Sequence, residues 1–350
     1  MTEVPITRFE APEAVEHGGD LGAVETRYPD APKPWLDLST GLNPVGYPVR
    51  ELASDVWQRL PSRDALDALI DAAARRYGVV DRNALVAAPG TQAVIQLLPR
   101  LTPTARVAIV GPTYAEHSIC WQRAGHEVAI VSDIAEAEAA DVVVAVNPDN
   151  PTGRLLPTSR LRALRASLLV VDEAFIDFFP AEASLAVDLP TNTVLLRSLG
   201  KTYGLGGLRL GFAIAPLPLA GRLKEELGPW AVSGPALEVG RRALDDQLWL
   251  EGARERLRVE GERLDRLLQA ADFSLLGAVP LFRLASHPEA RRLVQQLGRA
   301  GVHARSFAHQ PTWVRFGLPA GDQAFARLAA ALQVPQKVWQ TRSAGSGGSA

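Results

Sequence analysis

One lysine is placed where it could act as a reactive amine. The chain contains four lysines, Lys33, Lys201, Lys224 and Lys337, while arginine carries most of the positive charge. Lys201 lies in SLGKTYGLGGLR at 198–209, directly after an apolar strand-like run. Near a cofactor and other cations it would lose solvation, so its pKa would fall and leave the neutral amine that imine formation needs. Taken alone, the segment is explained equally well as a glycine-rich turn.

A second segment, APGTQ at 88–92, could hold a phosphate. It is typical of a loop that leads into a helix, where free backbone N–H groups and the helix dipole favour an anion. Gly90 and Thr91 would cradle the phosphate, and Ser198 and Arg209 could add a hydroxyl and a guanidinium to it. A simple turn with Thr91 as the helix N-cap explains this segment about as well.

Two further segments follow apolar runs and could contact an aromatic ring. Asn150, in NPDNPTG at 147–153, can donate its side-chain amide to a ring oxygen, although a structural turn explains the segment almost as well. Asp172, in VVDEAF, ends an apolar run, where a carboxylate is costly unless it has a partner. A pyridine nitrogen is one such partner, because the negative charge favours the protonated ring that accepts electrons. A helix cap or an ion pair is the structural alternative.

These segments belong to an alternating pattern of helices and strands between residues 62 and 215. The pattern predicts a parallel sheet covered by helices, with strands buried on both faces. Because ligands bind beyond the carboxyl ends of parallel strands, the four segments are expected to meet there. The predicted strands are 106–111, 126–131, 141–147, 168–175, 193–198 and 209–215, and the predicted helices are 64–77, 91–98, 114–124 and 159–166.

The same patterns divide the chain into four parts. Residues 1–60, rich in Pro and Gly, are expected to form an N-terminal arm and part of a small domain, and residues 61–225 a large cofactor-binding domain. Residues 226–332 begin with a long amphipathic stretch at 237–268 and predict a small α+β domain. Residues 333–350 end in SAGSGGSA and are expected to be a flexible tail.

The composition is typical of a soluble globular protein and excludes several classes of function. Apolar residues make up 47% of the chain, and the net charge of −2 offers no broad positive field for a nucleic acid. No segment approaches about 18 uninterrupted apolar residues, so we expect no membrane span. Cys120 is the only cysteine and cannot form an internal disulfide. Together with an N-terminus that lacks an apolar export signal, this indicates a cytoplasmic protein.

Other catalytic motifs fail at specific positions. The GKT at 200–202 is similar to the end of a P-loop, but the glycine required five residues before Gly200 is Leu195. Gly204 and Gly206 begin a dinucleotide fingerprint whose third glycine position holds Arg209. The sequence has no G-x-S-x-G elbow, no H-E-x-x-H motif and no paired-cysteine metal site, so neither that type of hydrolase nor a metal site is expected.

In chain order, GTQ, GPTY, NPDNPTG, VVDEAF and SLGKTYGLGGLRLG resemble the fold-type I pyridoxal-phosphate enzymes, specifically the histidinol-phosphate aminotransferase-like group. The resemblance covers about residues 17–330. It implies the aspartate-aminotransferase fold, an α/β architecture with a mainly parallel seven-stranded central sheet, helices on both faces and a smaller α+β domain. It also implies pyridoxal 5′-phosphate as the cofactor.

The resemblance implies roles for individual residues. Lys201 would form the Schiff base, Asp172 would pair with the ring nitrogen, and Tyr114 would stack on the pyridine face. Asn150 would contact the ring hydroxyl, and Arg315, in PTWVRFGL, would clamp the substrate carboxylate. The cofactor phosphate would be held by Gly90, Thr91, Ser198 and Arg209.

Within this group the chain is most similar to the threonine-phosphate decarboxylases of cobalamin biosynthesis. His17 begins the arm signature HGGD and is expected to contact the substrate phosphate, and Phe175 replaces the tyrosine usual in the aminotransferases. The implied reaction is decarboxylation of L-threonine O-3-phosphate to (R)-1-amino-2-propanol O-phosphate. Leu60 departs from the pattern, because many relatives have there a tyrosine that reaches the cofactor phosphate across a dimer.

The residues themselves leave the reaction open. Decarboxylation follows if the substrate carboxylate is held perpendicular to the cofactor ring, and transamination follows if the hydrogen is. Histidinol-phosphate or another amino-acid aminotransferase is therefore the leading alternative, and a non-catalytic regulatory protein with this fold is a third. The expected partners are a phosphorylated amino acid and a second copy of the chain in a homodimer, with no nucleic acid and no membrane.

Overall fold

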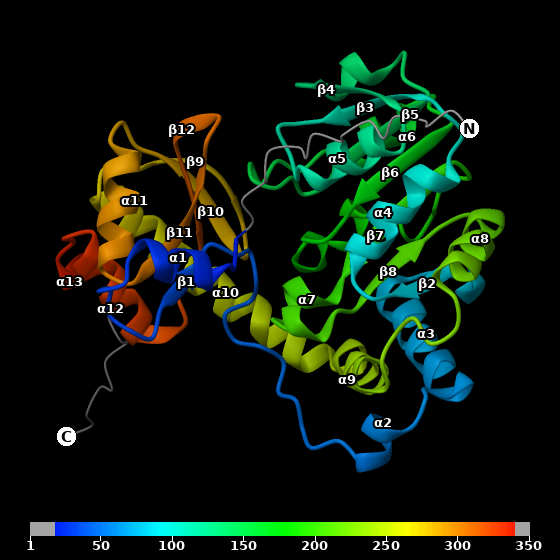
Figure 1. Cartoon of the computed structure of the whole chain (residues 1–350), viewed down its shortest axis with the longest axis horizontal. Helices are drawn as coiled ribbons and strands as arrows, with labels where there is room; N and C mark the ends of the chain where they lie inside the picture. The colour runs from blue at the N-terminus through cyan, green and yellow to red at the C-terminus, as the bar shows by residue number, and fades with distance from the viewer. Residues whose placement is uncertain (1–17, 340–350) are drawn as a thin grey trace, which may run out of the picture.

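A large β-sheet forms the centre of the main lobe (Figure 1). The computed structural model describes residues 18–339, and within them this sheet has seven strands in the order β2-β8-β7-β6-β5-β3-β4. Neighbours from β7 through β4 pair in parallel, whereas β8 is antiparallel to both β2 and β7. The strands are β2 (Leu85–Ala88), β3 (Arg106–Val110), β4 (Glu127–Val131), β5 (Val142–Val146), β6 (Leu168–Asp172), β7 (Thr193–Ser198) and β8 (Gly211–Ile214).

The predicted α/β fold class is confirmed, and each of the predicted strands of this region is present. The sequence does not predict β2, because its four residues, LVAA, carry too little pattern to mark a strand. The expectation that every strand is buried on both faces is wrong for β4. This strand lies at the edge of the sheet and pairs with β3 alone, and Ile130 is 64% exposed.

Helices cover both faces of the sheet. Residues of α3, α6 and α9 join the hydrophobic core on one face, and residues of α4, α5 and α8 join the core on the other. Cys120 is buried in the second core. These helices are α3 (Arg63–Tyr77), α4 (Thr91–Leu101), α5 (Glu116–Arg123), α6 (Thr158–Ala163), α7 (Leu199–Thr202), α8 (Leu217–Leu227) and α9 (Gly234–Asp245). Short 3-10 turns are η1 (Arg82–Ala84), η2 (Ile134–Ala137), η3 (Ile176–Phe178), η4 (Ala181–Ala183) and η5 (Gly206–Leu208).

A smaller sheet forms the second lobe, with the order β1-β11-β12-β10-β9 in the described part of the chain (Figure 1). Its first strand comes from the N-terminal arm and pairs in parallel with β11. The strands are β1 (Leu36–Leu38), β9 (Ser274–Val279), β10 (Phe282–Ser286), β11 (Val302–Phe307) and β12 (Gln310–Gly317). The remaining helices are α1 (Leu21–Arg27), α2 (Ser54–Gln58), α10 (Gln247–Ala270), α11 (Ala290–Arg299), α12 (Gly321–Ala331) and α13 (Gln336–Trp339).

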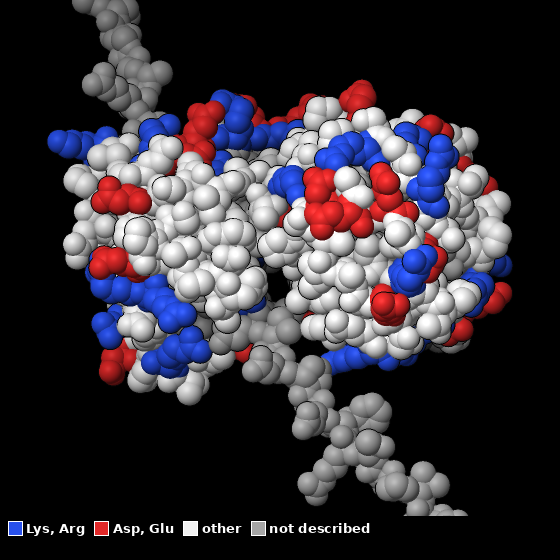
Figure 2. Space-filling model, turned by 90° about the horizontal axis from the view of Figure 1, so that it is seen from above, with Lys and Arg blue, Asp and Glu red and all other residues white. Residues whose placement is uncertain are grey.

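Basic and acidic side chains are interspersed on the face shown in Figure 2, in keeping with the net charge of −2. Between residues 18 and 339, no helix is both long enough and apolar enough to cross a membrane.

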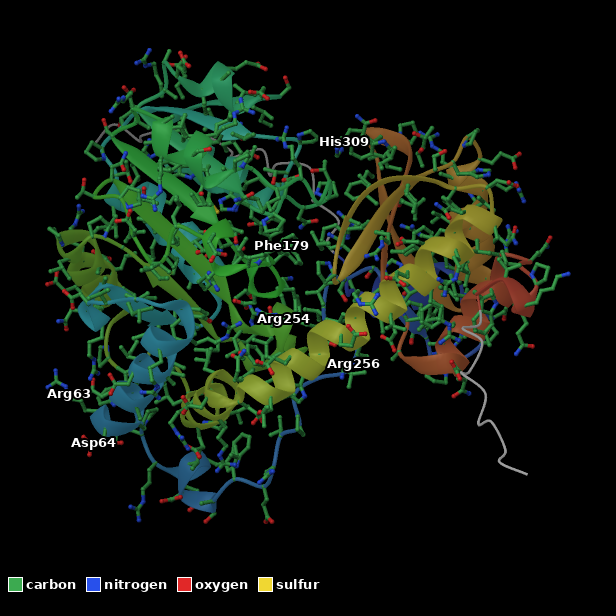
Figure 3. All side chains as sticks on the ribbon, turned by 180° about the vertical axis from the view of Figure 1, so that it is seen from behind. Arg63, Asp64, Phe179, Arg254, Arg256 and His309 are labelled. Atoms are coloured by element: carbon green, nitrogen blue, oxygen red, sulfur yellow. The ribbon has the colours of Figure 1, made fainter. Side chains whose placement is uncertain are left out.

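The amphipathic stretch expected at 237–268 is two helices. Asp246 caps the end of α9 and the start of α10. Its carboxylate accepts a hydrogen bond from the backbone N–H of Trp249 (3.0 Å), in the first turn of α10. Helix α10 then runs from the main lobe to the small lobe, and Figure 3 marks Arg254 and Arg256 along it. The small lobe also extends past residue 333, where a flexible tail was expected. Trp339 is 1% exposed and stacks on Phe325, with ring centroids 6.1 Å apart.

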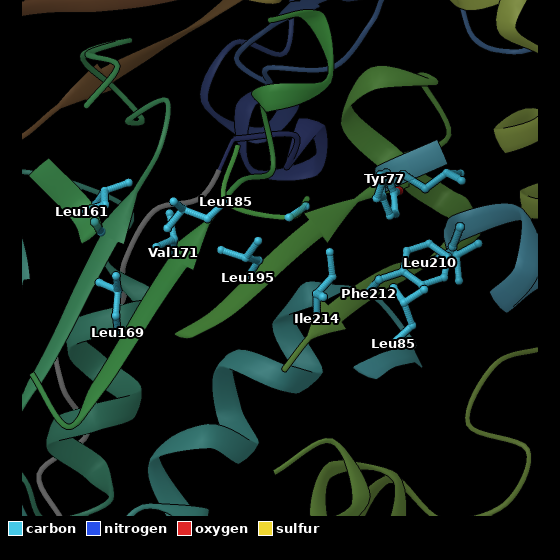
Figure 4. Close-up of a cluster of buried hydrophobic side chains, with 14 of the residues drawn as sticks. Tyr77, Leu85, Leu161, Leu169, Val171, Leu185, Leu195, Leu210, Phe212 and Ile214 are labelled. Carbon is cyan, nitrogen blue, oxygen red and sulfur yellow. The ribbon is translucent and has the colours of Figure 1, made fainter. Parts of the chain in front are cut away.

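Side chains of β6 and β7 alternate between the two cores of the main lobe, as successive residues of a strand must. Leu169, Val171 and Leu195 point into the core drawn in Figure 4. Val170 and Leu196 point into the opposite core. The last residues of these strands continue the same alternation, so neighbours in sequence face opposite sides of the sheet.

The two lobes touch at a glycine, Gly277, in the edge strand β9, and this contact predicts an effect on stability. A Cβ on Gly277 would overlap the carbonyl oxygen of Thr152, in the loop that carries Asn150. Gly277→Ala is therefore expected to lower the free energy of unfolding by about 2 kcal/mol, measured by urea denaturation. The control is Gly252→Ala in α10, where an added Cβ meets no atom within 4 Å and should stabilise the helix by about 0.5–1 kcal/mol. Equal midpoints for the two variants would contradict the prediction.

Candidate active site

The residues predicted to bind a cofactor line one cavity of about 190 Å³, to which the carboxyl ends of β6 and β7 contribute. Arg315 lies outside this lining but hydrogen-bonds to Asn150, and His17 lies outside the described residues. The cofactor roles of these residues stay predictions. The cavity brings together all eight: Gly90, Thr91, Tyr114, Asn150, Asp172, Ser198, Lys201 and Arg209.

One end of the cavity is built for an anion. Gly90 has φ +82° and directly precedes α4, so the free N–H groups at the start of that helix lie at the cavity. The Arg209 guanidinium lies close to Gly90, and a Cβ added at residue 90 would be only 2.8 Å from Arg209 Nη2. Arg209 adopts left-handed backbone angles, φ 52° and ψ 55°, and its Nη1 donates to the Gly206 carbonyl at 3.0 Å. The hydroxyl-bearing Ser198 lines the same cavity.

Lys201 lies in the short helix α7, which follows β7 directly. Burial lowers the pKa of its amine to about 8, and the positive charges of Arg315 and Arg209 act in the same direction, while Asp172 opposes them. The amine lies 5.7 Å from the centroid of the Phe175 ring. With a pKa near 8, roughly 10–20% of the amine is neutral near pH 7, far more than for an ordinary lysine, and the neutral form is the nucleophile.

Asp172 is buried and has partners within the protein. Its Oδ1 accepts from the backbone N–H of Ala174 (3.0 Å), and its Oδ2 lies 3.2 Å from Nε2 of the buried His117. The structural alternatives for this carboxylate thus hold in part, yet Asp172 still lines the cavity. Sequence reasoning missed His117, because a histidine in the first turn of a helix carries no signal of its partner.

Tyr114 borders the cavity beside His117, with ring centroids 6.1 Å apart. Burial raises the pKa of its phenol to about 12, and the negative charges of Glu116 and Asp172 add to this. The hydroxyl donates to Oε1 of Gln92 at 3.2 Å. At neutral pH the ring is therefore uncharged and available for stacking.

Arg315 is buried at the other side of Asn150. One of its nitrogens donates to the Asn150 side-chain oxygen and the other to the backbone oxygen of Ser39 (2.6 Å). Burial and, to a lesser extent, the positive charge of Arg305 lower the pKa of this guanidinium to about 10, while Asp37 opposes them. Arg305 is directly opposite Arg315 in the β11–β12 pairing. Two like charges opposite each other on a sheet are destabilising unless an anion joins them.

The N-terminal arm also reaches the lysine-bearing helix, which the sequence did not reveal. The backbone N–H of Asn43 donates to the Lys201 carbonyl, and its side-chain amide donates to the Thr202 carbonyl, both at 3.0 Å. Asn43 is buried. Because helix α7 ends here, the arm satisfies carbonyls that the helix leaves without internal partners.

Chemically, the cavity combines three functions. It offers donors for a phosphate at the Gly90 end, a buried carboxylate at Asp172, and a partly neutral amine at Lys201. Leu60 does not line this cavity and is 67% exposed. The set suits a phosphorylated aromatic aldehyde whose ring nitrogen pairs with a carboxylate.

Comparison with known proteins gives consistent matches. The model of the family "Aminotransferase class I and II" matches residues 34–332. The chain is 40% identical to the threonine-phosphate decarboxylase of Pseudomonas aeruginosa and 42% identical to that of a Sinorhizobium species, in each case over 91% of this chain and 97% of the relative. Among solved structures, the histidinol-phosphate aminotransferase from Sinorhizobium meliloti in complex with pyridoxal-5′-phosphate has the same fold. Its TM-score is 0.78 at 23% identity, over 89% of this chain and 92% of that one.

The low pKa of Lys201 can be measured directly in cofactor-free protein. After reductive ¹³C-methylation, one lysine signal should titrate near pH 8 and be absent from Lys201→Arg. Because the charge of Arg315 lowers this pKa, Arg315→Met should move the midpoint upward, toward the usual value of 10.5. A Lys201 signal that titrates near 10.5 in the unmutated protein would contradict the structure.

Proposed function

Because this chain belongs to the aminotransferase class I and II family, we propose that it is a pyridoxal-phosphate-dependent decarboxylase acting on L-threonine O-3-phosphate. The products are carbon dioxide and (R)-1-amino-2-propanol O-phosphate, a step of cobalamin biosynthesis. The proposal is carried by one combination: a lysine with a pKa of about 8 shares a cavity with Asp172 and an anion site. The choice of substrate is supported by 40–42% identity to threonine-phosphate decarboxylases over nearly their whole length.

The residues of the cavity fit pyridoxal phosphate. Gly90 has no side chain, so the Arg209 guanidinium can lie close to the backbone there. The start of α4 supplies N–H donors, and the guanidinium and these donors together suit the phosphate. Asn150 faces the same cavity and can donate its amide to the ring hydroxyl oxygen, since its own carbonyl oxygen is taken by Arg315. When bound, the cofactor supplies an aldehyde that condenses with an amine and a ring that accepts electrons released at the substrate α-carbon.

Two residues then control protons. The Asp172 carboxylate is placed to hold a proton at the ring nitrogen, and the His117 contact fixes the direction of this carboxylate. Lys201, with a pKa of about 8, can hold a proton and deliver it to the α-carbon after carbon dioxide leaves. The α-carbon thus loses a carboxylate and gains a hydrogen.

The pair of opposed arginines suits a substrate with two anionic groups. Arg315 is the expected clamp for the carboxylate, and Arg305 is held beside it by strand register. Two neighbouring guanidinium groups suit a substrate that carries both a carboxylate and a phosphate, which supports a phosphorylated amino acid as the substrate class.

Phe175 supports a decarboxylase rather than an aminotransferase. Its ring packs edge-to-face on Phe282, with centroids 5.3 Å apart, and it offers no hydroxyl to the cofactor ring oxygen, which is left to Asn150. The aminotransferases usually have a tyrosine here. The alternative, a histidinol-phosphate or other amino-acid aminotransferase, is separated from this proposal by the products.

Product analysis tests the proposal. The PLP-loaded protein should release carbon dioxide and aminopropanol phosphate in equal amounts from threonine phosphate, without consuming 2-oxoglutarate. Lys201→Ala should lower kcat by at least about 10³-fold, because the amine reacts directly. Lys337→Ala is the control, since Lys337 is exposed on α13 and does not line this cavity. Transfer of the amino group to 2-oxoglutarate would instead identify an aminotransferase, and protein that neither binds PLP nor turns over substrate would indicate a regulatory role.

A homodimer is part of the same proposal. The arm exposes apolar side chains at Trp57 (68%) and Leu60 (67%), and the loop after α8 exposes Trp230 (58%). Pro61 and Trp230 line one hollow of about 490 Å³. Exposed apolar groups around such a hollow favour a protein partner, and a second copy of the chain is the partner we propose.

Sedimentation equilibrium tests the dimer. The unmutated chain should sediment with twice its mass of 37.6 kDa. The double variant Trp57→Asp, Leu60→Asp loses buried apolar contact, so the dissociation constant of its dimer should be at least about tenfold higher. Ile130→Asp is the matched control, with similar exposure on β4 at the opposite edge of the sheet. An unmutated monomer with full activity would overturn the dimer.

A further inference from the structure

A buried ionic network lies beside the candidate active site. The Arg197 guanidinium donates to Glu173 Oε2 (2.9 Å) and Asp177 Oδ1 (2.5 Å). The other oxygen of Asp177 accepts from the Thr202 hydroxyl (2.8 Å), and Glu173 accepts from the Ser184 hydroxyl (2.7 Å). Apart from Ser184, which is partly buried, these side chains are almost entirely buried. We call these five residues the anchor network.

Three members of the anchor network are sequence neighbours of predicted cofactor contacts. Glu173 follows Asp172, Arg197 precedes Ser198, and Thr202 follows Lys201. Because strand residues alternate, Arg197 continues the face of Leu195 in Figure 4, while Ser198 continues the opposite face and lines the cavity. Glu173 is bonded to Arg197 on that same side. The anchor network therefore fixes the backbone of the residues predicted to contact the cofactor, from the face of the sheet opposite to the cavity.

The energetics of such a cluster argue for a positioning role. Burial raises the pKa of Glu173 even though Arg197 lowers it, which reflects the desolvation that this carboxylate undergoes. Arg197 also lies 4.3 Å above the Tyr77 ring. Well-packed apolar residues of similar volume often match or exceed a buried ion pair in stability. What the ions add is direction, because the forked guanidinium fixes two carboxylates at set angles.

The network also reaches the helix that joins the lobes. Arg254 on α10, marked in Figure 3, donates from Nη2 to the backbone oxygen of Asp177 at 2.7 Å. Asp177 thus contacts β7 through Arg197, α7 through Thr202, and α10 through Arg254. Among the described residues, this one aspartate ties the lysine-bearing helix both to the sheet and to the long helix.

From these contacts we infer that Asp177 and Thr202 are positioning residues, which hold helix α7 so that the Lys201 amine stays inside the cavity. The inference rests on the proposed function only in taking Lys201 as the reacting amine. The Thr202 hydroxyl is one residue from Lys201, and its bond to Asp177 fixes the last turn of a helix only four residues long. Without that bond, helix α7 can shift and water can reach the amine.

Thr202→Val removes the hydroxyl and keeps the shape of the side chain. In cofactor-free protein, the pKa of Lys201 should rise from about 8 by about one unit, because the amine gains solvation while Arg315, Arg209 and Asp172 remain. In PLP-loaded protein, kcat should fall about tenfold with KM changed less than about twofold, as for a displaced reacting group. Thr202→Ser restores a hydroxyl and should restore both values.

Thr193→Val is the matched control, because Thr193 is another fully buried threonine whose hydroxyl bonds to Asn192 at the far end of β7. It should leave the pKa of Lys201 and kcat unchanged. A purely structural role predicts a lower unfolding midpoint for Thr202→Val with both values unchanged, and that result overturns the inference. If Thr202→Val does not fold, Asp177→Asn is judged by the same two values.

The measured pKa separates this inference from the proposed function. A raised pKa in Thr202→Val with no turnover of threonine phosphate by any variant supports the positioning role and refutes the substrate. An unchanged pKa together with normal decarboxylation by the unmutated protein refutes the positioning role alone.

Discussion

The amine of Lys201 is largely desolvated and feels the charge of two guanidinium groups, and the chemistry of the site depends on this arrangement. Desolvation and the charges of Arg315 and Arg209 lower its pKa to about 8, and the Asp172 carboxylate is the opposing charge. Positive charge thus lies at the Gly90 end of the cavity and, behind Asn150, at Arg315, and this charge favours anions in the site. A phosphorylated cofactor and a doubly anionic substrate supply the charge that this surface lacks.

The alternation of side chains along β6 and β7 explains how one pair of strands serves both stability and chemistry. Residues of one register, ending in Asp172 and Ser198, lead into the cavity. Residues of the other register pack in the core of Figure 4 and end in the ion pair of Glu173 and Arg197. A shift of one residue in either strand would exchange these faces. The position of the cofactor contacts is thus tied to the packing of the core.

The sequence predicted most of the fold and the cavity because their signals are local. Lys201, Asp172 and Asn150 each follow a continuous apolar strand, and parallel strands bring their carboxyl ends together. Residues that meet only through tertiary structure gave no such signal. The position of Arg305 depends on the register of the β11–β12 pair, and Asn43 reaches Lys201 across more than 150 residues of chain. The edge position of β4 likewise depends on strand order, which apolar periodicity does not encode.

The central claim is that the Lys201 amine is the group that joins the cofactor. Reduction of PLP-loaded protein with sodium borohydride, followed by peptide mapping by mass spectrometry, tests it most directly. The account predicts a stable pyridoxyl group on Lys201 and none on Lys33, Lys224 or Lys337. Protein that remains unlabelled, or a label on any other lysine, would contradict it.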